Sequence, residues 1–166
     1  MRSQRGFTLI ELMVTIAILA IITTVAVPGF SNLIRNTKAS GLSNDLVGAL
    51  QYARSEAVNR NQAVAVCSGL TVATCDAGWT NGWIVYVVSD SSILRSWEAA
   101  AADSVINQDS GTNSTVIFGG DGKATGTTEI KMNISGCTGS EERVLDVSSL
   151  GRVSVRRTTC ATTTSS

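Results

Sequence analysis

The chain of 166 residues contains no histidine, the residue on which many catalytic and metal sites depend. A Ser or Cys nucleophile therefore lacks its usual general base, and the carboxylates form no obvious pair at helical spacing. The four cysteines include no Cys-x-x-Cys, so the sequence does not indicate a zinc site. We therefore expect a protein that is not an enzyme and that carries no metal or cofactor.

An excess of charge of either sign is also lacking, because 13 Lys and Arg balance 13 Asp and Glu. A nucleic-acid-binding domain usually carries a marked positive excess, and the whole-chain charge does not indicate one. Proline occurs once, at Pro28. Because proline cannot donate a backbone hydrogen bond, we expect it to kink or locally melt a helix that contains it.

The most informative segment that is present is Gly6-Phe7-Thr8-Leu9-Ile10-Glu11-Leu12, which opens an apolar run that reaches Phe30. The run is long enough to cross a bilayer as a helix of about twenty residues. Glu11 is anomalous within it, since a carboxylate costs roughly 2.5 to 3.5 kcal/mol at the bilayer centre and less near a helix end. We expect a partner that offsets this cost.

The six residues before the run decide how it is interpreted. Residues 1–6 carry two arginines and no acid, which favours their retention on the cytoplasmic side of a membrane. An ordinary secretory signal is cut after its apolar core, whereas here the polar-to-apolar boundary between Gly6 and Phe7 precedes the core. A plain signal anchor that tolerates an acid near its end is the alternative interpretation.

This arrangement resembles the class III signal of type IV pilins and type II secretion pseudopilins. The resemblance implies that a prepilin peptidase cuts between Gly6 and Phe7 and methylates the new amino terminus of Phe7. It also implies that Glu11 pairs with the terminal amine of a neighbouring subunit in the filament core, since a buried charge needs such a partner. The region of Pro28 would partly unfold during assembly. Without residues 1–6, 11 Lys and Arg oppose 13 Asp and Glu, a net charge of −2.

The hydrophobic pattern becomes periodic in residues 31–61. Apolar residues recur there at intervals of three and four, which predicts a helix with one buried stripe made of Leu42, Leu46, Ala49, Leu50, Ala53 and Ala57. The polar residues expected to face water are Lys38, Asp45, Gln51, Arg54 and Arg60. Residues 7–30 and 31–61 are thus predicted to form one long helix, first a membrane and filament-core anchor and then the spine of a domain.

The remaining residues, 62–166, are predicted to form a β-rich domain on the periplasmic side of the bacterial inner membrane. Short strands separated by turn-forming residues are expected at 63–67, 83–88, 93–97, 116–118, 129–134, 144–147 and 153–155. Asp121-Gly122 predicts a hairpin turn between Phe118 and the next strand. The predicted fold class is α+β, and the resemblance implies a pilin-like fold with the long helix packed on antiparallel sheet.

A calcium loop competes with the turn as an interpretation of Asp121, because Asp109 and Asn113 offer further oxygen ligands. No Asp-x-Asp ladder accompanies them, so the pattern of a calcium loop is incomplete.

The four cysteines all lie beyond residue 66, in the part expected outside the inner membrane, where disulfides persist. Four cysteines allow three pairings, and the sequence does not choose among them rigorously. We favour Cys67–Cys75 and Cys137–Cys160, because each closes a short segment rich in Gly, Ser and Thr. Each bridge would stabilise the domain by about 2 to 4 kcal/mol.

Four further motifs indicate which group of pilin-like proteins the chain resembles. They are Tyr52-Ala53-Arg54-Ser55-Glu56-Ala57-Val58-Asn59-Arg60, Gly78-Trp79-x-x-Gly82-Trp83, Phe118-x-x-Asp121-Gly122 and Gly151-Arg152-Val153. Together they resemble the GspH/FimT family of minor pseudopilins and minor pilins. The resemblance implies a subunit of the priming tip complex of a type IV pilus or a type II secretion pseudopilus. Its partners would be the other minor subunits and the major subunit.

Cations gather near the C-terminus, at Arg143, Arg152, Arg156 and Arg157. A strand would place Arg152, Ser154 and Arg156 on one face. Some FimT-like minor pilins resemble DNA receptors, and they have a Gly-Arg-x-Arg motif at this end of the chain. In the present sequence Ser154 stands at the position of the second arginine. The alternative function is therefore a DNA receptor that contacts phosphates. The competing interpretation is structural: the arginines would be charges on an edge strand, where they prevent unwanted pairing with other strands.

Overall fold

The structure is a computed structural model that describes residues 7–75, 78–110, 115–139 and 141–160, with backbone only at 25–28 and 109–110. The chain divides into two compact units, residues 1–34 and residues 35–166. Its elements in chain order are α1 (Leu9–Arg60), β1 (Val64–Ser68), the short 3-10 helices η1 (Val72–Thr74) and η2 (Trp79–Asn81), β2 (Trp83–Val87), β3 (Ile93–Trp97), β4 (Ser104–Ser110), β5 (Thr115–Phe118), β6 (Thr128–Ile134), β7 (Glu142–Val147) and β8 (Val153–Thr158).

The first unit consists of the apolar half of α1, whose large side chains are exposed. Phe7 is 85% exposed, and Ile10 and Met13 are 70% and 62% exposed. In the part of the chain that the structure describes, α1 is the one helix long and apolar enough to cross a membrane. A surface of this kind requires lipid or other apolar helices around it. Of the two effects expected of Pro28, a kink or local melting, the melting is not found, because the helix continues through that residue and a proline removes only one helical hydrogen bond.

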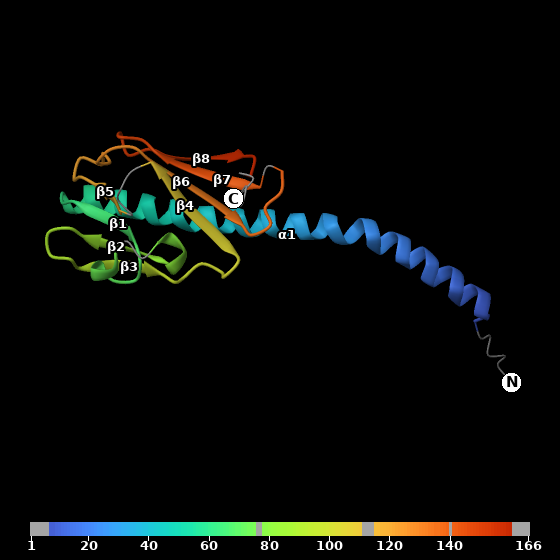
Figure 1. Cartoon of the computed structure of the whole chain (residues 1–166). Helices are drawn as coiled ribbons and strands as arrows, with labels where there is room; N and C mark the ends of the chain where they lie inside the picture. The colour runs from blue at the N-terminus through green and yellow to red at the C-terminus, as the bar shows by residue number, and fades with distance from the viewer. Residues whose placement is uncertain (1–6, 76–77, 111–114, 140, 161–166) are drawn as a thin grey trace, which may run out of the picture. The chain divides into compact units, whose positions relative to one another are not determined.

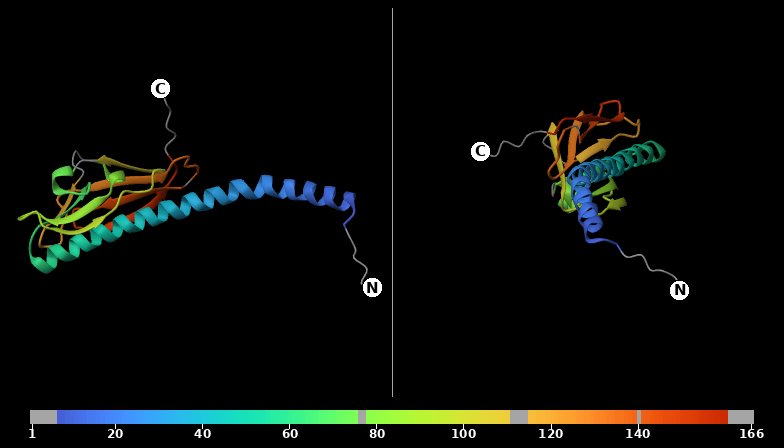
Figure 2. Two further views of the ribbon diagram at one scale, coloured as in Figure 1. Left: turned by 90° about the horizontal axis from the view of Figure 1, so that it is seen from below. Right: turned by 90° about the vertical axis from the view of Figure 1, so that its right-hand side faces the viewer.

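The second unit holds two four-stranded antiparallel sheets along the C-terminal half of α1 (Figures 1 and 2). The first sheet has the strand order β3-β2-β1-β5, and the second has the order β4-β6-β7-β8. Figure 1 shows β1, β2 and β3, in green, on one flank of the helix and β6, β7 and β8, in orange to red, on the other. Both sheets therefore share the helix as their common support.

One core joins the helix to both sheets. The stripe predicted from the sequence is buried, with Leu46, Leu50 and Ala53 at 0% exposure, whereas Leu42 is only half-buried. Phe118 of the first sheet and Leu145 of the second are also fully buried in the same core. Burying a side chain of this size contributes about 1.5 to 3 kcal/mol. The helix is therefore the spine of the domain, as its period predicted.

Two details of the predicted sheet are wrong. Strand β4 was not expected, because its sequence Ser-Val-Ile-Asn-Gln-Asp-Ser offers few apolar residues. It lies at a sheet edge, with Ile106 in the core. The turn at Asp121-Gly122 exists, with the amide of Gly119 donating to the carbonyl of Lys123 at 2.9 Å. It closes a short hairpin, since Phe118 and Ala124 form an antiparallel bridge, but the strand that it was expected to lead to, β6, pairs with β4 and β7 in the other sheet.

Candidate functional site

The start of α1 is closed by a reciprocal pair of hydrogen bonds between Thr8 and Glu11. The amide of Thr8 donates to Glu11 Oε2 at 3.3 Å, and the amide of Glu11 donates to Thr8 Oγ1 at 3.3 Å. The Thr8 hydroxyl also contacts Glu11 Oε2 at 3.2 Å. This is a capping box, in which the third helical residue is Glu or Gln. A carboxylate in the first turn is further stabilised by the positive end of the helix dipole.

The capping box gives Glu11 a local role that the sequence analysis did not include. It offsets part of the cost of a carboxylate beside an apolar surface, but its partners are neutral groups. Gly6, on the other side of the expected cleavage bond, lies outside the described residues, whereas Phe7 is described and exposed.

The motif residues of the domain meet around the guanidinium of Arg54. Arg54 Nε donates to the carbonyl of Gly122 at 2.9 Å, and Nη2 donates to the carbonyl of Leu150 at 3.1 Å. One helical side chain thus holds two turns that are 28 residues apart in the sequence. Arg54 was expected to face water. Its hydrogen bonds to these two carbonyls instead hold the side chain against the end of the core, where it is half-buried.

The glycines of the same motifs are required by close backbone approach. Gly151 has φ +75°, and a Cβ there would lie 2.1 Å from the carbonyl oxygen of Gly122. Gly122 has the same φ, and its Cβ would lie 3.1 Å from a methyl group of Val58. The separate motifs at 54, 122 and 151 are therefore one structural junction.

The two motif tryptophans are core residues, with Trp79 3% and Trp83 2% exposed. The indole Nε1 of Trp79 donates to Gln108 Oε1 on β4 at 3.1 Å. The ring of Trp83 stacks on that of Trp97, with centroids 6.5 Å apart. Both act first in packing, as their size predicts.

The four C-terminal arginines do not form one free basic surface. Arg143 is only 3% exposed and donates to the side chains of Asn36 and Ser40 on α1 and to the carbonyls of Glu141 and Glu142. Burial and, secondly, the nearby charge of Arg157 lower the pKa of Arg143. Arg143 thus fastens β7 to the helix, and its burial excludes it from direct contact with DNA.

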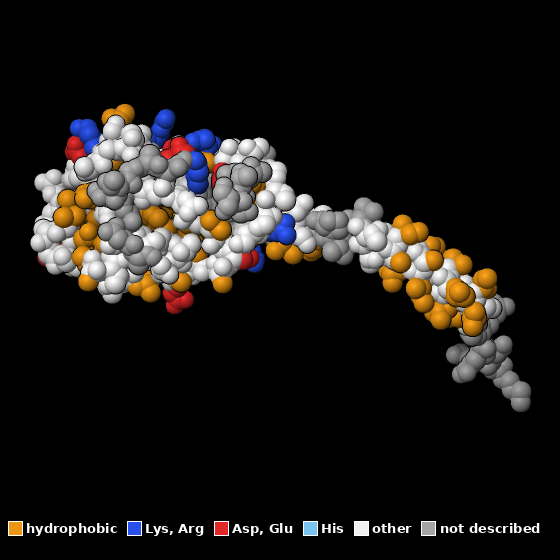
Figure 3. Space-filling model, in the orientation of Figure 1, with side chains coloured by type: hydrophobic (Ala, Val, Ile, Leu, Met, Phe, Trp, Pro, Cys, Tyr) orange, Lys and Arg blue, Asp and Glu red, His pale blue; other side chains and the backbone are white. Residues whose placement is uncertain are grey.

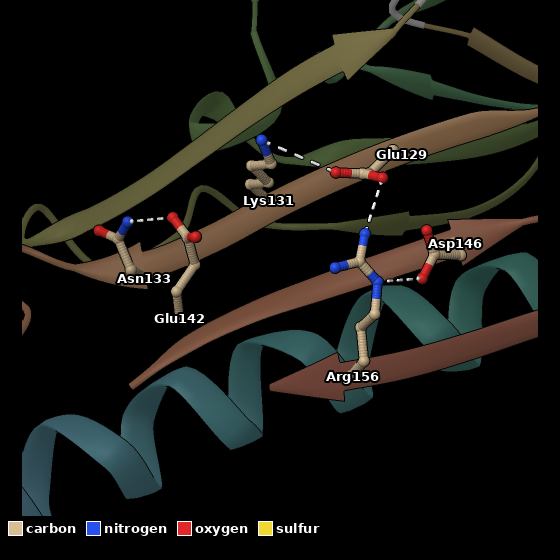
Figure 4. Close-up of polar contacts among 6 residues, drawn as sticks. All are labelled: Glu129, Lys131, Asn133, Glu142, Asp146 and Arg156. Atoms are coloured by element: carbon tan, nitrogen blue, oxygen red, sulfur yellow. Dashed lines mark hydrogen bonds and ion pairs between the residues drawn. The ribbon is translucent and has the colours of Figure 1, made fainter. Parts of the chain in front are cut away.

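Arg156 is held by two carboxylates on the opposite face of the same sheet (Figure 4). Its Nε lies 3.0 Å from Asp146 Oδ2, and its Nη2 lies 2.8 Å from Glu129 Oε2. Hydrogen bonding to Asp146 raises the pKa of Arg156, with a further contribution from Glu129. Lys131 lies 3.7 Å from the other oxygen of Glu129. The charge of Arg156 is therefore largely neutralised by carboxylates of the domain itself.

The two remaining arginines are exposed in different places. Arg152 precedes β8 and lines a cavity of about 290 Å³ together with hydroxyl groups and the carboxylates of Glu129 and Asp146. Arg157 lies in β8 opposite Arg143 in the strand register. Strand alternation places Arg156 and Arg157 on opposite faces of the sheet. The predicted common face of Arg152, Ser154 and Arg156 is thus lined with acids.

The structure contains the disulfides Cys67–Cys75 and Cys137–Cys160, the pairing favoured from the sequence. Glu141 lies close enough to Cys137 and Cys160 to suggest a metal cluster by geometry, but the disulfide occupies both sulfurs. Of the three suggested calcium ligands, Asn113 lies outside the described residues and the side chain of Asp109 is not described. Asp121 binds Lys123 Nζ at 2.9 Å.

Several partners in these contacts were missed by the sequence analysis. Asn36 and Ser40 were not connected with Arg143, because 107 and 103 residues separate them from it. Glu129 and Asp146 were not connected with Arg156 for the same reason. Correct strand register would have found the second set, since Glu129, Asp146 and Ser154 are successive partners across β6, β7 and β8.

Curated relatives of the chain include type IV major fimbrial proteins. The type IV major fimbrial protein FimA of Dichelobacter nodosus is 33% identical over 101 residues, which are 60% of this chain and 55% of that protein. Prepilin peptidase-dependent protein D of Escherichia coli K12 is 43% identical over 86 residues, which are 49% of each. The chain spans about half the length of the curated relatives it matches.

Solved structures share the fold. The type IV minor pilin FimU of Pseudomonas aeruginosa superposes with a TM-score of 0.60 at 23% identity, covering 72% of this chain and 89% of that one. The minor pseudopilin EpsH from the type 2 secretion system of Vibrio cholerae superposes with a TM-score of 0.53 at 10% identity, covering 72% and 97%. At this identity the likeness shows the pilin-like fold alone.

Two family models match the sequence itself. The prokaryotic N-terminal methylation motif matches residues 1–27, and the model described as type II transport protein GspH matches residues 42–151. The second match includes Arg54, Gly122 and Gly151, which the structure brings together in one junction. The chain therefore belongs to the GspH family, the pilin-like subunits of type IV pili and type II secretion systems.

Proposed function

We propose that the protein is a non-enzymatic minor pilin or pseudopilin that joins the tip or priming complex of a filament. The bacterial inner membrane would hold it through residues 7–30, with the domain of residues 62–166 in the periplasm. A prepilin peptidase would cut between Gly6 and Phe7 and methylate Phe7. The other minor subunits and the major subunit would then be its partners.

The observation that carries this proposal is Glu11 at the start of an exposed apolar helix. An apolar surface of this length is stable in lipid and, after extraction, only among other apolar helices. Among the described residues, the amide and hydroxyl of Thr8 are the hydrogen-bond partners of the Glu11 carboxylate. A neighbouring subunit's terminal amine supplies the opposite charge that a buried carboxylate needs. The presence of Glu11 thus favours a position in the filament at which another subunit lies ahead of this one.

The first test is the mass of the native protein purified from membranes. The proposal predicts a chain that begins at a methylated Phe7. A Gly6→Leu variant is the control, because enlarging the residue before the cleavage bond should leave the leader in place. A native mass that includes Met1 contradicts the proposed processing.

A DNA receptor is the second candidate, and the exposed guanidinium groups of Arg152 and Arg157 favour it. Contacts with phosphates are strongly weakened by salt. Binding of the protein to double-stranded DNA should therefore fall steeply with salt and fall again in an Arg152→Ala/Arg157→Ala variant. Arg156→Ala is the matched control, because Arg156 is already paired with Asp146 and Glu129. Absence of salt-dependent binding contradicts this candidate.

A further inference from the structure

A cavity of about 460 Å³ lies within the second unit, between α1 and the ends of β2 and β3. Ligand sites in proteins are usually cavities of about 300 to 1,000 Å³. Figure 3 shows hydrophobic and acidic side chains at the surface along the lower side of the domain, the side on which Figure 1 places β2 and β3. This cavity, the Trp cavity, is lined mostly by apolar side chains, and its lining includes Lys38, Leu42, Asp45, Trp83, Trp97 and Glu98.

Two apolar side chains of the Trp cavity are incompletely packed. Leu42 belongs to the helical stripe whose other members, from Leu46 to Ala57, are fully buried, yet Leu42 is only half-buried. Trp97 is likewise half-buried, although its ring stacks on that of Trp83. Apolar area of this kind is removed from water favourably when another surface covers it. The domain alone therefore leaves its core open at the Trp cavity.

Trp83 lines the same cavity and has a donor without an acceptor. Its side chain is 2% exposed, and among the residues that the structure describes its indole Nε1 forms no hydrogen bond. A buried indole N–H usually has a partner, as Nε1 of Trp79 has in Gln108. A ligand that brings a carbonyl oxygen to Trp83 would supply the missing acceptor.

The charged groups of the Trp cavity are unequally paired. Nζ of Lys38 lies 2.8 Å from Oδ2 of Asp103, which balances that cation. The guanidinium of Arg95, the other cation nearby, stacks 4.6 Å from the centre of an aromatic ring. Asp45 and Glu98 are exposed, and within the described ranges neither carboxylate forms a hydrogen bond or an ion pair. The Trp cavity therefore offers two carboxylates to a cation.

We propose that the Trp cavity is a docking site for a segment of a neighbouring filament subunit that carries a lysine or an arginine. The cationic group binds Asp45 and Glu98 through charge-assisted hydrogen bonds. The stem of the same side chain covers Leu42 and Trp97, since long basic side chains lay their methylene groups along apolar surface. A main-chain carbonyl of the segment accepts from Nε1 of Trp83. This inference rests on the proposed function, which supplies the neighbouring subunit.

The first test titrates the full chain, in detergent micelles and with isotope-labelled tryptophan, and follows the indole N–H signals by NMR. The probe is the tripeptide amide Ala-Lys-Ala, acetylated at its amino end. The site predicts saturable shifts of the Trp83 and Trp97 signals, whereas the signal of Trp79, which is bound to Gln108, stays in place. The same peptide with norleucine in place of lysine keeps the stem without the charge, so it should bind several-fold more weakly.

An Asp45→Asn/Glu98→Gln variant should bind the lysine peptide several-fold more weakly, with an unchanged Trp79 signal as evidence that the fold is kept. Asp90→Asn is the matched control, because Asp90 is an exposed acid in the turn at the other end of the β2–β3 hairpin. Absence of saturable binding, equal binding of the lysine and norleucine peptides, or equal weakening in Asp90→Asn overturns the site. Hexylammonium chloride that binds as tightly as the lysine peptide assigns the cavity to small amines and also overturns it.

The second test places a photo-cross-linking amino acid at Ala99, an exposed residue of the cavity wall, and irradiates sheared filaments. The site predicts a cross-link to a segment of another subunit that contains lysine or arginine, weakened several-fold by Asp45→Asn/Glu98→Gln. The same amino acid at Ser91, in the distant turn, should give a cross-link that the double variant does not change.

The outcomes separate the site from the proposed function. If the chain enters filaments but the Ala99 cross-link is absent, is unchanged in the double variant or falls on a segment without a basic residue, the site alone is overturned. Absence of the unchanged chain from sheared filaments overturns the proposed function and the neighbouring subunit as the occupant. The peptide titration then decides by itself whether the Trp cavity binds a basic segment.

Discussion

The guanidinium of Arg54 and the carbonyl of Gly122 are joined by a hydrogen bond of 2.9 Å, which ties the last turns of α1 to the loop between the two sheets. The same guanidinium binds the carbonyl of Leu150 at 3.1 Å. An exposed loop would ordinarily move independently of the core. Here one side chain fixes two loops, and it brings motifs that are far apart in the sequence into one junction.

Replacing Arg54 with Ala should therefore destabilise the domain, because it removes two charge-assisted hydrogen bonds. We expect a loss of about 1.5 to 3 kcal/mol, measured by urea unfolding of the detergent-solubilised protein. Arg60→Ala is the matched control, since its exposed bridge to Glu56 contributes only a few tenths of a kcal/mol. Equal unfolding midpoints for the two variants would refute the role given to Arg54.

Gly151→Ala should be more damaging than Gly126→Ala. Both Gly151 and Gly126 have positive φ, at +75° and +91°, and a Cβ in that region costs about 1 to 2 kcal/mol. Of these two glycines, only Gly151 would place its new Cβ against a backbone oxygen, that of Gly122. The unfolding free energy should therefore fall further in Gly151→Ala than in Gly126→Ala. Indistinguishable values would show that the close approach is unimportant.

Stability should decrease as the pH falls from about 5 to 3. A hydrogen bond from Lys38 lowers the pKa of Asp103, and one from Lys123 lowers the pKa of Asp121. The unfolded chain, with ordinary pKa values near 3.9, then binds more protons than the folded one, so stability rises with pH in this range. This contribution is present above the unfolded pKa and is lost as the pH falls through the folded one.

The matched variants for this pH effect are Asp103→Asn and Lys38→Met. Each removes the ion pair of 2.8 Å between the two residues, so each should make the urea midpoint fall less steeply between pH 5 and 3. An unchanged slope in both variants would contradict the assignment. The effect should be small, because both side chains are exposed.

Removal of the Cys137–Cys160 disulfide should cost about 3 kcal/mol, because it closes a segment with a sequence separation of 23. The measurement is the urea midpoint of a Cys137→Ala/Cys160→Ala double variant. The bridge also adjoins Gly136, whose carbonyl binds Arg35, so that contact should loosen. A midpoint equal to that of the unchanged protein would contradict the expected stabilisation.

The helix and most strands could be predicted because their signals are local. The stripe from Leu46 to Ala57 repeats with helical period, and β3 was predicted with the bounds that it has. Strand β4 could not be predicted, since its pairing with β6 depends on residues far away in the sequence. Whether each arginine is buried or paired with an acid likewise depends on the register of the strands. Arg143 and Arg156 look alike in sequence, yet one is buried on the helix and the other is paired on the outer face.

The central claim, that the charge of Glu11 is what brings the protein into a filament, is tested most directly by Glu11→Gln. Glutamine can serve in a capping box, so the helix start should be retained while the charge is lost. Thr8→Ala is the converse control, since it removes the Thr8 hydroxyl of the box and keeps the charge. The measurement is the amount of the protein that co-purifies with sheared filaments, at equal membrane levels. The account predicts that Glu11→Gln is nearly absent from filaments and Thr8→Ala is retained; normal incorporation of Glu11→Gln would contradict it.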